Sequence, residues 1–197
     1  MDKIRVFVNL FLILIVIILL IGVFLVKQTN NQITAKVIDS QENNGIDGTI
    51  QQIKEGLRFS RANISYIISQ DCSKISTQKM IAAFSILENY TKIKFIEQEN
   101  PDLTIDCFSV AFSEDLTKLS EGGPTLIAGK EILEAKIILY DSENNAGCSV
   151  PMIELHELFH ALGFIHTTKK GSIMYPIFSC DKTLDSEIFD ILNEEYD

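Results

Sequence analysis

The sequence predicts a mixed α/β (α+β) domain that follows a single transmembrane helix. Three observations support this fold class: an apolar run at residues 6–26, an alternation of short strand and amphipathic helix patterns over residues 60–197, and a globular composition with 46% hydrophobic residues. The length of 197 residues allows one domain and an extension, at about 100–200 residues per domain.

The apolar run at residues 6–26 is interrupted only by Asn9 and Gly22, and it accounts for the positive mean hydropathy of +0.17. A helix of this length measures about 31 Å, close to the hydrocarbon thickness of a bilayer. A cleaved signal peptide is the alternative. Its apolar region would be only about 7–15 residues long and would end in a small-x-small site, which is missing here. We therefore expect an uncleaved signal anchor.

The charges that flank this run predict its orientation. Lys3 and Arg5 precede it, whereas Lys27 and Lys36 follow it more diffusely. Basic residues favour the cytoplasmic side, so we expect a single-pass protein with residues 1–5 in the cytoplasm and the domain outside it. After residue 26 the chain has 15 basic and 26 acidic residues. Together with the overall net charge of −10, this acidity argues against a nucleic-acid partner.

Residues 27–59 are expected to form a polar stalk between the bilayer and the domain. The stretch carries turn signals at Asn43-Asn44-Gly45 and Asp47-Gly48. A short helix is expected around residues 50–57. The folded domain is then expected over residues 60–197.

Three main helices are expected in this domain, over residues 76–90, 151–162 and 184–195. Ser76 is a suitable N-cap for the first helix, in which apolar residues recur at helical spacing. The last helix has an apolar face, with Asp185 near its positive N-terminal end.

Strands are expected between these helices because short apolar or alternating segments are bounded by turn residues. The expected strands cover residues 64–68, 93–97, 103–112, 125–128 and 135–140. Residues 121–124, with the sequence Glu-Gly-Gly-Pro, are expected to form a loop.

The four cysteines form an even set, which in an oxidising compartment permits two disulfides. Three pairings can be drawn. We expect Cys72–Cys107 and Cys148–Cys180, because each bridge would then brace one half of the domain. Four buried free thiols are the alternative. The absence of a C-x-x-C spacing argues against a cysteine zinc site.

All three histidines of the chain lie in one segment, from His156 to His166. Positions i and i+4 of a helix share a face, so His156 and His160 can direct their rings at one point. Gly163 can end the helix in a left-handed conformation, after which the chain can return with His166. Three neutral imidazoles leave a fourth position for water, which is typical of a catalytic zinc site.

Glu157 follows the first of these histidines and projects beside the site, where it can reach a water molecule. The alternative is a charged amphipathic helix with surface histidines. The glycine and the third histidine stand at the required spacing, and the chain has no other histidine. These features favour the metal site.

The pattern H-E-x-x-H-x-x-G-x-x-H resembles the signature of the metzincin zinc peptidases, which is followed by a Met-turn. The segment Ser172-Ile173-Met174-Tyr175-Pro176 resembles that turn. The resemblance implies that Met174 forms a hydrophobic floor beneath the ligands; an ordinary core methionine is the alternative. It also implies that Tyr175 is not a ligand, because Pro176 stands where families with a ligating tyrosine place it.

Within the metzincins the chain is most similar to the matrixins. Thr167 stands where matrixins usually have serine, and Met-Tyr-Pro matches their turn. Weaker matches follow in the correct order at residues 81–84, 90–95, 101–105 and 122–128. The resemblance implies a twisted mixed sheet. The chain departs from the family in having Phe159 for the usual glycine, no cysteine-switch propeptide and no histidine for a second zinc. No pattern indicates a structural Ca²⁺ site.

The resemblance implies an endopeptidase with one catalytic Zn²⁺ and with Glu157 as the general base toward water. An extended peptide would pair with the edge strand by main-chain hydrogen bonds. The residues so implied are Leu126, Ile127 and Ala128 on that strand, and Pro176, Ile177 and Phe178 as a pocket wall. Core packing is the alternative for Ile177 and Phe178. Two other functions compete: a non-catalytic zinc-binding scaffold or interaction module on a membrane tether, and a zinc amidase acting on cell-wall peptides.

Overall fold

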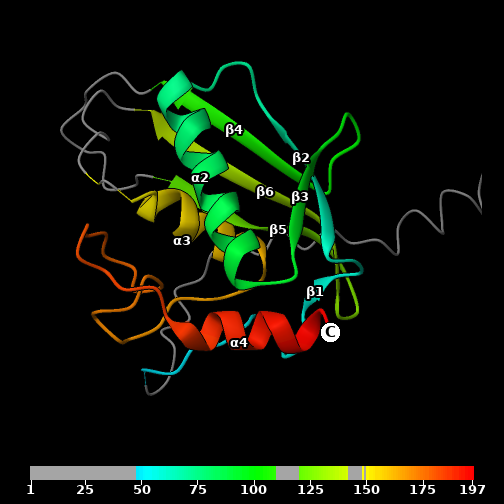
Figure 1. Ribbon diagram of the computed structural model, residues 1–197, viewed down its shortest axis with the longest axis vertical. Helices are drawn as coiled ribbons and strands as arrows, with labels where there is room; N and C mark the ends of the chain where they lie inside the picture. The colour runs from blue at the N-terminus through cyan, green and yellow to red at the C-terminus, as the bar shows by residue number, and fades with distance from the viewer. Residues whose placement is uncertain (1–47, 110–119, 142–147, 149) are drawn as a thin grey trace, which may run out of the picture. The chain divides into compact units, whose positions relative to one another are not determined.

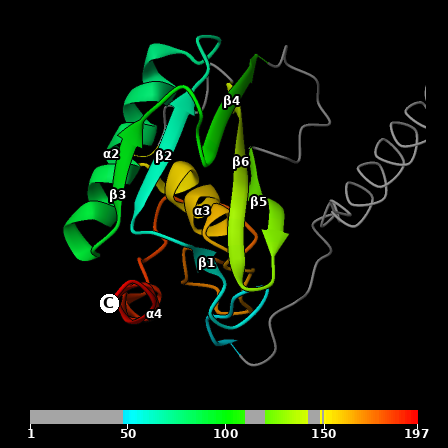
Figure 2. The ribbon, with the colours of Figure 1, turned by 90° about the vertical axis from the view of Figure 1, so that its right-hand side faces the viewer.

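The computed structural model describes residues 48–109, 120–141, 148 and 150–197. Within them, a mixed sheet is covered on one face by the helices α2, Lys74–Tyr90, and α3, Met152–Ala161 (Figures 1 and 2). A third helix, α4, Ser186–Glu195, lies beyond one end of the sheet (Figure 1). The predicted mixed fold with three main helices is therefore confirmed.

The sheet has the strand order β1-β6-β4-β2-β3, and β5 pairs with β6. The strands are β1, Arg58–Phe59; β2, Asn63–Ile68; β3, Lys94–Glu97; β4, Leu103–Ser109; β5, Ser120–Ala128; and β6, Glu131–Asp141. All these pairings are parallel except that of β5 with β6, which is antiparallel. Strand β5 is thus an antiparallel edge strand, and it lies against α3 (Figure 2).

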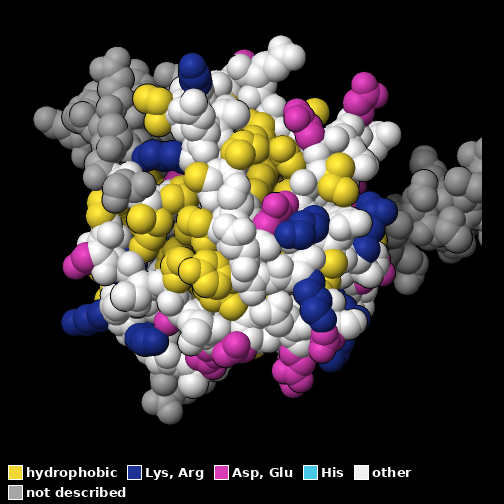
Figure 3. Space-filling model, viewed as in Figure 1, with side chains coloured by type: hydrophobic (Ala, Val, Ile, Leu, Met, Phe, Trp, Pro, Cys, Tyr) yellow, Lys and Arg dark blue, Asp and Glu magenta, His cyan; other side chains and the backbone are white. Residues whose placement is uncertain are grey.

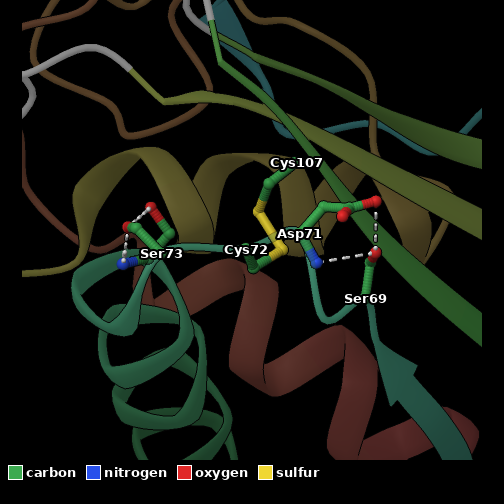
Figure 4. The surroundings of a disulfide bond; sticks show 6 residues. Ser69, Asp71, Cys72, Ser73 and Cys107 are labelled. Carbon is green, nitrogen blue, oxygen red and sulfur yellow. Dashed lines mark hydrogen bonds between the residues drawn. A yellow bond between two sulfur atoms is a disulfide. The ribbon is translucent and has the colours of Figure 1, made fainter.

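Helix α2 begins two residues earlier than the sequence predicts. Ser73, and not Ser76, is its N-cap, because the Ser73 hydroxyl accepts a hydrogen bond from the Ser76 backbone N–H at 3.1 Å. Just before this cap, a disulfide joins Cys72 to Cys107 in β4 (Figure 4). The start of the helix is therefore fixed to the sheet by a covalent bond.

Both expected disulfides are present: Cys72–Cys107, and Cys148–Cys180 with a sequence separation of 32 residues. Cys148 precedes α3, and Cys180 lies in the segment between α3 and α4. Cross-links that close loops of this size stabilise small domains by about 3–4 kcal/mol. The alternative of four free thiols is wrong.

The loop expected at residues 121–124 is wrong, because these residues belong to β5 and pair with residues 135–138 of β6. Glycine and proline are usually excluded from strands, and here their register is irregular between Pro124 and Ile127. Strand β6 is likewise longer than predicted, starting at Glu131. Residues 110–112, at the end of the strand expected over 103–112, lie outside the described part of the chain.

The folded body includes residues that the sequence assigns to the stalk. Ile50, Leu57 and Phe59 are buried, and Arg58–Phe59 forms β1. Residues 50–57 contain no helix. The start of the domain near residue 60 is thus placed too late, because these apolar side chains find their core partners only in the folded structure.

No helix in the described part of the chain combines the length and the apolar character needed to cross a bilayer. The predicted anchor at residues 6–26 and most of the predicted stalk lie outside that part.

The face that carries α2 is mixed in character. Figure 3 shows apolar side chains in separate patches, with Lys and Arg side chains lying among Asp and Glu side chains. Exposed apolar residues of α2 and β3 are Ile75, Ile81, Tyr90 and Ile96. The face thus presents both signs of charge around small apolar areas.

Candidate active site

Helix α3 brings the first two histidines of the motif together. His156 and His160 lie one turn apart, and the apolar residues around them, such as Leu155, Leu158 and Phe159, are buried in the core. This packing fixes the rotation of the helix about its axis. The two imidazoles therefore leave α3 on the same side.

The end of α3 is a Schellman motif that turns the chain back toward these rings. The N–H of Gly163, whose φ is 93°, donates to His160 O at 2.9 Å, and the N–H of Phe164 donates to Phe159 O at 3.0 Å. The Phe159 and Phe164 rings supply the apolar contact that accompanies this motif, with centroids 6.2 Å apart. The reversal brings His166 back to the two helical histidines.

The Nε2 atoms of the three histidines converge on one point. They lie 3.0 Å apart between His160 and His156, 3.1 Å between His160 and His166, and 3.2 Å between His156 and His166. Two ligands about 2.0–2.1 Å from a tetrahedral zinc ion lie about 3.3–3.4 Å from each other. The observed separations fall within a few tenths of an ångström of this value.

Backbone carbonyls hold two of the rings in the orientation that metal binding needs. His156 Nδ1–H donates to Ile173 O at 2.6 Å, and His160 Nδ1–H donates to Phe164 O at 2.7 Å. A proton on Nδ1 leaves the lone pair on Nε2, which is the atom turned toward the other histidines.

The same two rings are held in the neutral form. Burial lowers the pKa of His156 to about 4 and lowers the pKa of His160 well below its ordinary value. A neutral imidazole is the form that binds zinc. Together with the nitrogen of His166, these two neutral donors have separations that fit Zn²⁺.

The predicted Met-turn lies directly behind this cluster. Met174 is fully buried, and its carbonyl accepts a hydrogen bond from the Thr167 N–H at 3.0 Å. Ile173, the preceding residue, supplies the carbonyl that orients His156. The turn is therefore tied both to a ring of the cluster and to the residue after His166.

Asp185 anchors this turn, and the sequence pattern missed that role. It stands at the N-cap of α4 but makes no capping hydrogen bond with its side chain. Its carboxylate instead accepts from the Ser172 hydroxyl and from Lys169 Nζ at 2.8 Å. Ser172 Oγ in turn accepts from the Met174 N–H at 2.9 Å. From the sequence, Asp185 at the predicted start of the last helix is expected only to stabilise the helix dipole. Its contacts with Ser172 and Lys169 are visible only in the tertiary structure.

Glu157 lies on α3, and its buried side chain faces β5. Its Oε1 accepts a hydrogen bond from the Ser120 hydroxyl at 2.6 Å. A Cβ added at Gly122 would lie 2.5 Å from Glu157 O and 3.0 Å from its Oε2, so only glycine allows the strand to approach this closely. Sequence reasoning missed Ser120 and Gly122, because nothing in a Gly-Gly-Pro segment indicates contact with a distant helix.

The residues implied in substrate binding lie in two separate segments. Leu126 and Ile127 are partly buried and Ala128 is exposed at the end of β5. Pro176 is exposed, as are Ile177 and Phe178, with 66% and 40% of their surface accessible. The exposure of Ile177 and Phe178 excludes the alternative that they pack in the core.

The three converging histidines and the buried methionine turn fit the metzincin class of zinc peptidases. The model of the matrixin family matches residues 58–191, from β1 into α4, and the chain belongs to this family. A comparison with curated proteins finds no match.

Proposed function

We propose that this matrixin is a membrane-anchored zinc endopeptidase that hydrolyses peptide bonds in extended segments of proteins. The observation that carries the proposal is the convergence of three Nε2 atoms within 3.2 Å of one another, on and just after the helix that carries Glu157. His156, His160 and His166 would hold the ion. Bound there, a zinc ion would supply a Lewis acid that polarises the scissile carbonyl and lowers the pKa of its water to about 7.

Glu157 acts as the general base and acid in this proposal. Its carboxylate takes a proton from the attacking water and delivers that proton to the nitrogen of the leaving amine. Burial between α3 and β5 and the hydrogen bond from Ser120 hold the carboxylate in one place. Glu157 then needs little rearrangement when substrate binds.

The edge of β5 gives the substrate its extended conformation. A peptide that pairs near Leu126–Ala128 adds one strand to the sheet through main-chain hydrogen bonds. Exposed apolar side chains such as Ile177 and Phe178 supply contacts for the residue after the cleaved bond. The sequence specificity of cleavage would depend on that segment.

The anchor is the apolar run at residues 6–26, with residues 1–5 in the cytoplasm and the peptidase outside it. The two disulfides support this location, because they persist in oxidising compartments. Substrates would therefore be peptides or proteins outside the cytoplasm.

The decisive variant is Glu157→Ala. It should retain one zinc per chain yet cleave an unstructured protein about 10²–10⁴-fold more slowly, because the proton transfer is lost while the ligands remain. Metal analysis and peptide mass spectrometry measure the two properties. Glu187→Ala is the matched control, because Glu187 is exposed in the first turn of α4.

Three results would contradict the proposal: cleavage by the Glu157→Ala variant at the wild-type rate, no cleavage by the zinc-loaded wild type, or hydrolysis restricted to cell-wall peptides. The second result would favour the scaffold, and the third would favour the amidase.

A further inference from the structure

A short segment ahead of the family-matched region crosses the turn that follows α3. We call residues 50–57 the N-terminal strap. The N–H of Ile53 donates to Gly163 O at 2.7 Å, and the N–H of Ile165 donates to Gln51 O at 2.9 Å. Between these two bonds, Gln52 lies opposite Phe164 in an antiparallel bridge. The strap thus pairs with the backbone on both sides of Phe164.

The strap is itself fixed to the rest of the domain. The Gln52 side chain accepts from the Gly56 N–H at 3.0 Å, and donates to Leu57 O and to Glu195 Oε2, both at 3.1 Å. Leu57 is fully buried, and its Cδ2 lies 3.0 Å from where a Cβ on Gly163 would stand. The three hydrogen bonds of the Gln52 side chain, which we call the Gln52 fork, and the packing of Leu57 against Gly163 therefore fix the position of the strap relative to the turn.

The turn beneath the strap controls two of the three histidines. Phe164 supplies the carbonyl to which His160 Nδ1–H donates, and Ile165 directly precedes His166. Movement of residues 163–165 would rotate the His160 ring and displace His166 together. The Schellman hydrogen bonds hold this turn to the end of α3, and the bonds of Gly163 O and of the Ile165 N–H hold it to the strap.

We propose that the strap is a positioning element of the metal site, in which Gln51 O, the Ile53 N–H and the Gln52 side chain lock the turn that orients His160 and carries His166. The inference rests on the proposed zinc site but not on peptide cleavage. The strap lies in the sequence between the apolar run at residues 6–26 and the matched region at 58–191. Detachment of the strap would therefore loosen metal retention, which gives the N-terminal segment a role beyond that of a passive spacer.

Two matched pairs of variants test the proposal in the full-length protein. Ile53→Pro removes the N–H that bonds Gly163, whereas Ile53→Ala keeps it and removes only a side chain that is 38% exposed. Gln52→Ala removes the fork, whereas Gln51→Ala removes an exposed side chain that bonds only its near neighbour Thr49. The second pair leaves every backbone donor in place.

The measurements are the rate of zinc transfer to an excess of chelator and the visible spectrum of the Co²⁺-substituted protein. We expect Ile53→Pro and Gln52→Ala to release zinc about 10-fold faster than their controls and to shift the Co²⁺ bands, since partners that orient ligands contribute about 10–100-fold to affinity. Both are read at a temperature where far-ultraviolet circular dichroism shows each variant folded.

Equal release rates and unchanged Co²⁺ bands within the Gln52 and Gln51 pair would overturn the proposal, even if Ile53→Pro fails to fold. A wild-type protein that binds zinc but cleaves no peptide would refute the endopeptidase activity alone, because neither measurement uses a substrate.

Discussion

In His156 and in His160, Nδ1–H donates a hydrogen bond to a backbone carbonyl, and Nε2 points toward the other histidines. Neither carbonyl can be removed by a side-chain substitution. The orientation of each ring thus depends on the position of a turn: the turn that contains Ile173 orients His156, and the turn that contains Phe164 orients His160. The chemistry of single residues is in this way set by the placement of two loops.

Ser120 makes a testable contribution at the same scale. Ser120→Ala removes the hydroxyl that bonds Glu157 Oε1, so the carboxylate should sample unproductive positions. We expect kcat for a peptide substrate to fall about 10–100-fold, with KM and zinc content nearly unchanged. Steady-state kinetics on metal-loaded protein measures this.

Ser120→Thr should restore most of the rate because it restores a hydroxyl. Thr125→Ala, at an exposed position of the same strand, is the control. A tenfold rise in KM at constant kcat would assign Ser120 to substrate binding instead.

At the scale of elements, the approach of β5 to α3 decides the geometry around the general base. The strand can come this close only because Gly122 has no side chain, and its neighbour Gly123 has open space where a Cβ would stand. The two glycines look equivalent in the sequence. Their surroundings show that packing requires glycine at position 122, whereas position 123 has room for a larger side chain.

This difference predicts opposite outcomes for two alanine substitutions. Gly122→Ala forces a methyl group to 2.5 Å from Glu157 O, so it should lower the free energy of unfolding by about 1–3 kcal/mol and abolish most activity. Gly123→Ala should change stability by less than about 0.5 kcal/mol. Urea unfolding followed by fluorescence or circular dichroism measures both. Equal effects would show that β5 does not pack on α3 as described.

The sequence predicts those elements whose determinants are local. The spacing of His156, His160 and Gly163 predicts the helix and its end, because helix periodicity and a left-handed glycine act within a few residues. The pattern predicts a loop at residues 121–124 because glycine and proline disfavour strands, and only the pairing with β6 shows that they form one. The strap could not be predicted, since its partner is the turn after α3, far along the chain. The same holds for Asp185, whose contacts with Ser172 and Lys169 depend on how α4 docks.

At the scale of the whole molecule, the metal-free protein should lose stability as the pH falls from about 6.5 to about 4. Burial holds the pKa of His156 at about 4 and that of His160 well below its ordinary value, while both are ordinary in the unfolded chain. The unfolded state then binds more protons in this window. The free energy of unfolding should fall by about 1.4 kcal/mol per pH unit for each histidine.

Urea titrations of the metal-free protein at several pH values test this dependence. The variant His156→Gln, which lacks one of the two titrating groups, should show a shallower slope. A free energy of unfolding that stays constant from pH 6.5 to pH 4 would contradict the neutral, buried state of the histidines.

The proposed anchor predicts how the full-length chain partitions. Wild-type protein should remain with membranes after an alkaline carbonate wash. Ile15→Arg combined with Ile18→Arg should release it, because each charge at the centre of a span costs about 2.5–3.5 kcal/mol. Gln28→Arg combined with Asn31→Arg, beyond the apolar run, should leave it in the pellet. Release of the wild type by the wash would refute the anchor.

The irregular register of β5 between Pro124 and Ile127 makes this edge a poor template for strand pairing between copies of the chain. The unpaired backbone groups of an open edge strand can form hydrogen bonds with the edge strand of another copy, and repetition of this pairing leads to aggregation. Proline lacks the amide donor of a regular ladder, and the shifted register breaks the repeat of donors and acceptors. The edge is thereby suited to a short guest segment that docks and leaves, and unsuited to the continuous strand pairing that builds fibrils.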